Sequence, residues 1–111
     1  MSIQVILNQR KGPLPLTATF NAPSDAPSCL IISGSAWTQT ANQTIGIEVT
    51  LDGKPIGSAS IWSNAPATHR AVVPTYIPVK LAFGQHTIVL SAATSGTISD
   101  LNDFFDVVLD Y

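Results

Sequence analysis

The feature that most constrains this fold is a pair of alternating segments joined by a two-residue turn. Apolar residues alternate with smaller or polar ones along Ile45–Leu51, and this period of two indicates a strand with one buried face. Asp52-Gly53 follows, a pair that tolerates the positive φ of a tight hairpin turn. The alternation resumes along Ile56–Trp62. Because Pro55 cannot donate a hydrogen bond to a neighbouring strand, we expect the second strand of this hairpin either to lie at a sheet edge or to begin just past this proline.

Short alternating segments separated by Gly, Pro, Asn and Asp make up the rest of the chain. Further strands are expected at Ile3–Leu7, Leu16–Phe20, Cys29–Trp37, His69–Val73, Thr75–Leu81, Gln85–Ala93 and Asp103–Tyr111. Alternation predicts one face made of Ile3, Val5 and Leu7 in the first segment, and an apolar face made of Phe105, Val107, Leu109 and Tyr111 in the last. Gly34 permits a bulge or a close approach of another segment.

The number and spacing of these segments indicate the fold class. No segment shows the helical period of about 3.6 residues. About eight strands separated by turn residues are typical of a sandwich or a barrel. We therefore predict that residues 1–111 form one all-β domain. The predicted architecture is an antiparallel sandwich of the jelly-roll type, with an immunoglobulin-like sandwich as the alternative.

The low charge of the chain argues against some classes of binding partner. Only 11% of the residues are charged, and the net charge is −2. The chain therefore has no basic field for nucleic acid or anionic lipid, and we expect no nucleic-acid partner. No apolar run approaches the roughly 20 residues of a membrane span. The N-terminus shows no charged region followed by a long apolar one, so we expect no cleavable signal peptide. The chain is then cytoplasmic, exported by another route, or part of a larger particle.

Residues with reactive side chains are few and scattered. Cys29 is the single cysteine, and its apolar neighbours predict a buried thiol that packs as a small hydrophobe. His69 and His86 do not have the spacing of a metal site, although His69-Arg70 can bind an anion or a sugar hydroxyl. Glu48 is the only glutamate. We therefore expect no catalytic residues, no cofactor and no enzymatic activity.

One set of residues resembles a known family of jelly rolls. The segment Leu81–Leu90 has glycine before His-Thr and then an apolar strand, and Leu51-Asp52-Gly53 and the terminal Phe105–Leu109 accompany it. Together they resemble the C1q/tumour-necrosis-factor-like domains of bacterial and phage proteins. The resemblance implies a trimer whose aromatic inner faces pack about a three-fold axis. Candidates for that axis are Phe104, Tyr111 and Trp62.

The loop before the last strand contains the oxygen-bearing side chains of Asp100, Asn102 and Asp103. Calcium prefers such ligands. The loop resembles the calcium loop of small bacterial β-sandwich lectins that bind fucose, and this resemblance implies a metal site. Thr94 and Ile98 stand where that family has further carboxylates, and Tyr111 replaces its terminal glycine. We therefore expect no metal here, and instead Asx turns formed by Asp100 and Asn102.

Three aromatic residues lie where strands meet polar loops, namely Trp37, Trp62 and Tyr76. An exposed aromatic ring beside amides and hydroxyls is a common way to bind a sugar. Hydrogen-bond partners for the hydroxyls would be Asn42, Gln43, Asn64 and Arg70. The alternative is that each tryptophan covers the end of the core.

These residues predict a non-catalytic carbohydrate-binding module that is oligomeric, because linked copies raise the avidity of shallow sites. The alternative is a structural subunit of a virion, tail or surface appendage, whose exposed apolar face is an assembly surface. The two functions predict different effects of the same substitution. Replacing Trp37 or Trp62 abolishes glycan binding in the first and dissociates the assembly in the second.

Overall fold

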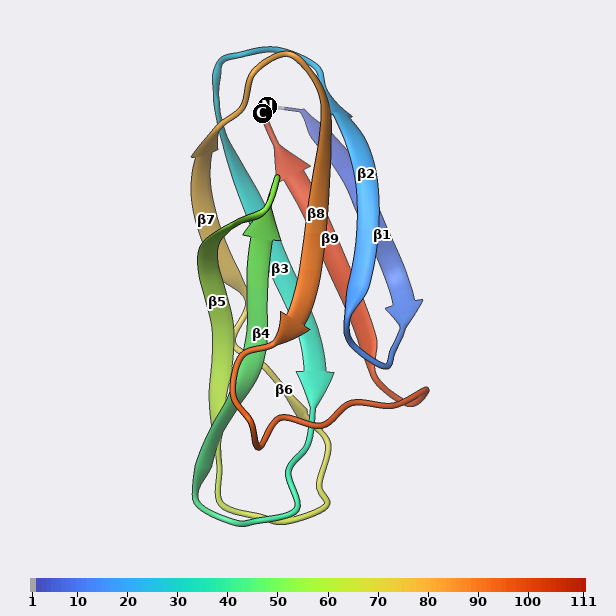
Figure 1. Ribbon diagram of the computed structural model, residues 1–111, viewed down its shortest axis with the longest axis vertical. Coiled ribbons are helices and arrows are strands. Elements are labelled where there is room, and N and C mark those ends of the chain that lie inside the picture. The colour runs from blue at the N-terminus through green and yellow to red at the C-terminus, as the bar shows by residue number, and fades with distance from the viewer. Residues whose placement is uncertain (1) are drawn as a thin grey trace.

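The computed structural model describes residues 2–111, which form nine β-strands in two antiparallel sheets (Figure 1). The strands are β1 (Ile3–Lys11), β2 (Leu16–Ala22), β3 (Pro27–Ala36), β4 (Gln43–Leu51), β5 (Lys54–Ser63), β6 (Arg70–Ala71), β7 (Thr75–Lys80), β8 (Gly84–Ala92) and β9 (Phe104–Asp110). Within residues 2–111 there is no helix of sufficient length and apolarity to cross a membrane.

The order of the strands identifies the sandwich as a jelly roll. The first sheet has the order β1-β9-β3, and β7 and β6 pair in series along the free edge of β3. The second sheet has the order β2-β8-β4-β5. The chain changes sheet at every connection except the β4–β5 hairpin and the β6–β7 link, as in a jelly roll. The jelly-roll prediction is therefore confirmed, and the immunoglobulin-like alternative is not the observed arrangement.

The β4–β5 hairpin has the predicted form. Ile45, Ile47 and Val49 are fully buried between the sheets. Asp52 and Gly53 have φ values of 49° and 84°, so both central residues of the turn are left-handed, as a tight hairpin requires. Since β5 pairs only with β4, it is an edge strand, which is one of the two arrangements expected from the proline after the turn.

The core lies between the inner faces of β3, β4, β8 and β9. Phe105, Val107 and Leu109 of β9 are fully buried, as predicted. Tyr111, predicted for the same face, follows β9 and is 39% exposed. The ring of Phe105 occupies the space where a side chain at Gly34 would lie, and Ile47 of the facing sheet contacts the same position. Gly34 therefore allows close packing of side chains at the centre of the core.

Three predictions about the strands are wrong in detail. β1 continues to Lys11, and register shifts on either side of Leu7 mark bulges. The bulge before Leu7 turns this side chain inward, while Ile3 and Val5 are 63% and 58% exposed. The strand expected at His69–Val73 shortens to Arg70–Ala71.

The third error concerns Cys29, which is only half buried. Leu30 and Ile32 occupy the inner face of β3, so the pleat directs the thiol to the outer face of the first sheet.

Candidate functional site

Two long loops meet at one end of the sandwich, the lower end in Figure 1. They join β3 to β4 (residues 37–42) and β5 to β6 (residues 64–69). The N–H of Ala67 donates to the carbonyl of Thr38 at 2.7 Å, so the loops are held together. Most of the predicted site residues lie in or next to these loops.

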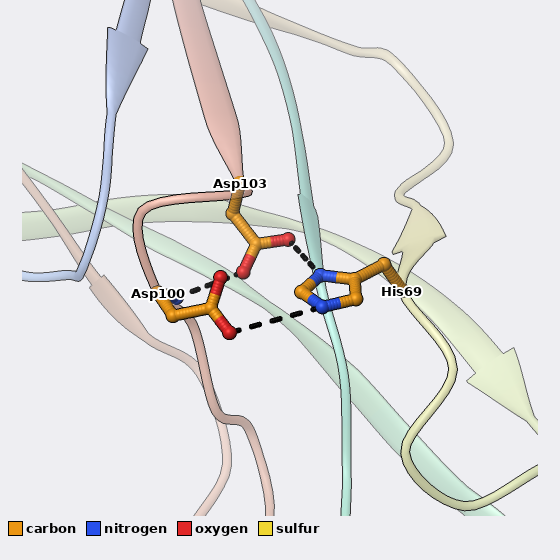
Figure 2. Close-up of side chains that lie close together, drawn as sticks. All are labelled: His69, Asp100 and Asp103. Carbon is orange, nitrogen blue, oxygen red and sulfur yellow. Dashed lines mark hydrogen bonds and ion pairs between the residues drawn. The ribbon is translucent and has the colours of Figure 1, made fainter.

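A buried carboxylate organises this end of the molecule. The side chain of Asp103, just before β9, is fully buried. Its Oδ1 accepts hydrogen bonds from Ser35 Oγ and His69 Nδ1, both at 2.7 Å. Its Oδ2 accepts the N–H of Asp100 at 2.9 Å. Asp103 thus connects β3, the β5–β6 loop and the β8–β9 loop (Figure 2).

His69 lies between two carboxylates. Its Nδ1–H donates to Asp103, and its Nε2 is 3.8 Å from Oδ2 of Asp100 (Figure 2). The hydrogen bond to Asp103 raises the pKa of His69, and the charges of Asp103 and Asp100 add to this effect, while partial desolvation opposes it. The protonated imidazolium is therefore the favoured partner of the buried carboxylate.

The same three residues have the chemistry of metal ligands. Their ligand atoms lie within 4.8 Å of one another. However, Asp103 Oδ1 already accepts two hydrogen bonds, and the raised pKa of His69 makes a proton compete with any metal ion at the ring. Asp100 Oδ1 accepts the N–H of Asn102 at 2.8 Å, which confirms the Asx turn predicted at Asp100.

Trp37 forms part of the scaffold of this end. Its backbone pairs with Ile98 in an isolated bridge, and its ring lies 6.0 Å from the ring of His69. The ring is partly buried, and its Nε1 is buried without a hydrogen-bond partner among residues 2–111. This arrangement favours the alternative in which Trp37 covers the end of the core.

The other two aromatic candidates lie on opposite faces of the sandwich. Trp62 stands opposite Thr44 on the outer face of the second sheet and is 58% exposed. Tyr76 stands opposite Ile31 on the outer face of the first sheet and is 65% exposed. Trp62 and Tyr76 therefore cannot contact the same small ligand on one molecule.

The four polar candidates for sugar binding also differ in position and in role. Arg70 Nη2 donates to Asn64 Oδ1 at 3.1 Å, two residues beyond Trp62. Asn42 is exposed at the tip of the β3–β4 loop, with a φ of 64°. Gln43 points into the loop end, where its Oε1 accepts Thr38 Oγ1 at 3.4 Å and lies against Gly96. Gln43 therefore supports the loops.

The second histidine lies at the opposite end of the sandwich. His86 Nδ1 is 2.6 Å from Asp52 Oδ2, and its Nε2 is 2.7 Å from the carbonyl of Ala82. Both neighbours are acceptors, so only the imidazolium can donate to both. The Ala82 carbonyl and then Asp52 raise the pKa of His86. His86 thus satisfies the backbone carbonyl of Ala82.

Sequence comparisons yield no relative: no family model matches this sequence, and no curated protein matches it. Solved structures do match in fold. The chain matches PorU from Porphyromonas gingivalis with a TM-score of 0.57 and 9% identity over 97% of its length, but spans only 12% of that protein.

Two further matches are separate domains of similar size. A family 35 carbohydrate-binding module from Clostridium thermocellum has 17% identity and a TM-score of 0.52, over 97% of this chain and 89% of that one. The CBM36-1 domain of a xylanase from the hindgut metagenome of Trinervitermes trinervoides has 12% identity and a TM-score of 0.53, over 97% and 95%. At these identities the matches establish the sandwich fold.

Proposed function

We propose that this domain binds carbohydrate without catalysing a reaction, and that Trp62 is the surface on which a sugar ring stacks. The observation that carries the proposal is the exposure of Trp62, 58% open to solvent at the loop end. A large aromatic side chain normally packs into a core, so its exposure next to polar loops suits an apolar ligand face with hydroxyls around its rim. The likeness to whole carbohydrate-binding modules supports the same function.

The polar groups near Trp62 suit sugar hydroxyls. Asn64 Oδ1 accepts a hydrogen bond from Arg70, which leaves the amide NH₂ of Asn64 free to donate to a ligand. Arg70 carries further guanidinium N–H groups. We therefore assign the site to Trp62, Asn64 and Arg70, with Asn42 on the neighbouring loop, and assign supporting roles to Trp37 and Gln43.

Self-association is part of the proposal. A single stacking ring and three hydrogen-bonding side chains form a small site, and presenting it in several copies raises the avidity by about 10²–10⁴. The second candidate function, an assembly subunit, is favoured by the exposure of Ile3, Val5 and Tyr76 on the first sheet. A trimer, as the C1q/tumour-necrosis-factor resemblance implies, is one form that such an oligomer can take.

The test is a glycan-array screen of the purified protein, with calcium and with EDTA, comparing the native chain with Trp62→Ala. We expect saturable binding of the native chain in both buffers and a loss of at least about tenfold in the variant. The matched control is Phe83→Ala, which removes a ring that is 77% exposed in the β7–β8 loop.

Several outcomes would reject this assignment. A blank array in both buffers rejects carbohydrate binding. Equal losses in Trp62→Ala and Phe83→Ala reject the site, and loss of binding in EDTA alone rejects the metal-free form of the proposal.

A further inference from the structure

The outer face of the first sheet carries an unusual apolar patch. Strand register places Val5, Val108, Ile31 and Tyr76 side by side in one row across β1, β9, β3 and β7. The next row consists of Ile3, Asp110, Cys29 and Pro78. In these two rows Asp110 is the only charged residue. Val5, Ile3 and Tyr76 are each more than half exposed.

The outer face of the second sheet shows how this chain builds a solvated surface. Strand register places mainly hydroxyl-bearing side chains there, including Thr17, Thr19, Thr50, Thr87, Ser58 and Ser91. The two faces therefore differ in chemistry although both belong to the same sandwich. Contiguous exposed apolar rows are uncommon on monomers and mark interaction surfaces.

We propose that this patch, made of the two rows, is the interface of a symmetric dimer. The two-fold axis would run parallel to the strands, along the line between β9 and β3. This operation places β1 of one copy over β7 of the other, and β9 over β3, with the rows kept level. Face-to-face sheets pack with their strands within about 30° of each other, so this register is available.

The arrangement matches each side chain with a suitable neighbour. Val5 faces Tyr76 of the second copy, and Val108 faces Ile31 of the second copy. In the next row, Ile3 faces Pro78. An apolar core therefore forms across the centre of the interface, as in stable protein interfaces.

The carboxylates also fit this symmetry. Asp106 and Asp110 both lie on β9, so they would face Ser33 and Cys29 on β3 of the second copy. The acidic groups of the two copies therefore do not face one another. Each copy carries a net charge of only −2, which opposes association weakly.

The patch lies on a broad side of the molecule. The molecule measures 43 × 25 × 21 Å, and the view in Figure 1 along the shortest axis faces the broad side of the sheets. A standard interface buries roughly 800 Å² on each partner, so the dimer would also bury residues around the two rows. The polar residues around the patch would form its rim. This proposal gives a definite form to the self-association proposed above. Two copies associate, whereas the C1q/tumour-necrosis-factor resemblance implies three. The dimer does not depend on sugar binding.

The test measures molar mass by light scattering and sedimentation from micromolar to near-millimolar concentration. We expect the native chain to approach twice its mass of 11.7 kDa. The double variant V5K/Y76K sets lysine against lysine at both ends of the interface and should raise the dimer Kd at least about tenfold. V5K/Y76E sets lysine against glutamate and should recover part of the lost affinity. Thr19→Lys, on the outer face of the second sheet, should leave the dimer unchanged.

Alkylation of Cys29 supplies a second measurement, because the patch covers this thiol in the dimer. The alkylation rate should fall with protein concentration in the native chain and not in V5K/Y76K. A native chain that stays monomeric, an oligomer of three copies, or an oligomer unaffected by V5K/Y76K overturns the proposal. If the protein is a dimer and the glycan array is blank, carbohydrate binding is rejected and the interface is retained. If the protein binds glycans and stays monomeric, only the interface is rejected.

Discussion

Asp103 shows how one buried charge can hold three segments of a β-sandwich together. Its two oxygens accept hydrogen bonds from β3, from the loop before β6 and from its own loop. A buried carboxylate is tolerated only when such donors replace water. The proposed sugar-binding residues Asn64 and Arg70 flank the loop that ends at His69, so Asp103 indirectly positions the site.

Replacing Asp103 by Asn should therefore destabilise the domain. The new amide keeps one acceptor but directs an NH₂ group either at the N–H of Asp100 or at both Ser35 and the His69 ring, so at least one donor loses its partner. We expect a loss of about 1–3 kcal/mol in the free energy of unfolding. Urea denaturation should show a lower midpoint with an unchanged slope. Asp25→Asn, in an exposed turn, is the matched control, and an equal shift in both variants would contradict the role given to Asp103.

Individual residues were the least predictable part of the molecule. The sequence places Trp37 and Trp62 in similar settings, at the end of a strand and before a polar loop, yet one is partly buried and the other is 58% exposed. Trp37 pairs with Ile98 and lies near the His69 ring, whereas Trp62 lies on the outer face of the second sheet. The His69–Asp103 hydrogen bond joins residues 34 positions apart, and no local pattern in the sequence reveals it.

Individual strands were more predictable where turns and alternation agree. Asp52-Gly53 sets the turn, and alternation predicts the buried residues of β4. The register with β5 shifts between Val49 and Thr50, which the turn does not predict. In β1 the alternation of Ile3, Val5 and Leu7 predicts one face, but the bulge between Val5 and Leu7 divides them between two. An extra residue in a strand has no sequence signature when no glycine marks it.

Close packing at Gly34 makes β3 sensitive to a single methyl group. A Cβ at this position would overlap the Phe105 ring and lie 2.9 Å from a methyl group of Ile47. Phe105 lies on the neighbouring strand of the same sheet and Ile47 lies on the facing sheet, so relief requires both core side chains to move. We expect Gly34→Ala to cost about 1–3 kcal/mol in the free energy of unfolding.

Thermal and urea unfolding check this expectation, with Ser33→Ala as the control on the same strand. Ser33 points to the outer face, and its truncation should change the free energy of unfolding by no more than about 0.5 kcal/mol. A Gly34→Ala variant as stable as native would show that the core adjusts around position 34.

The pH dependence of stability is a property of the whole molecule because both histidines contribute to it. The pKa values of His69 and His86 are raised above the ordinary 6.5. Their contribution is therefore complete below pH 6.5 and is lost as pH rises through the raised values. The pKa of Asp52 is lowered from 3.8, mainly by His86, so its contribution is present above pH 3.8 and is lost as pH falls through the lowered value.

We therefore expect the melting temperature to be highest between pH 3.8 and pH 6.5 and to decline as the pH rises above this range. Scanning calorimetry between about pH 5 and pH 9 tests this. His69→Gln and His86→Gln should each flatten the alkaline decline, and the double variant should remove most of it. A melting temperature that rises across this range would show that the histidines gain nothing from protonation in the folded state.

The overall architecture was predictable because it depends on many weak signals that agree. Turn residues and alternation indicate a jelly roll, although they do not reveal which strands pair. The pairing of β1 with β9, and of β3 with both β9 and β7, joins segments from distant parts of the chain. The apolar row on the first sheet appears only when these pairings align Val5, Val108, Ile31 and Tyr76.

The β1–β9 pairing also brings the two ends of the described chain together. Ser2 and Tyr111 exchange two backbone hydrogen bonds, with N···O distances of 2.7 and 2.9 Å. A polypeptide can therefore enter and leave this fold at a single point. Such a domain can be spliced into a surface loop of an unrelated host without stretching the host, or closed into a ring and reopened elsewhere.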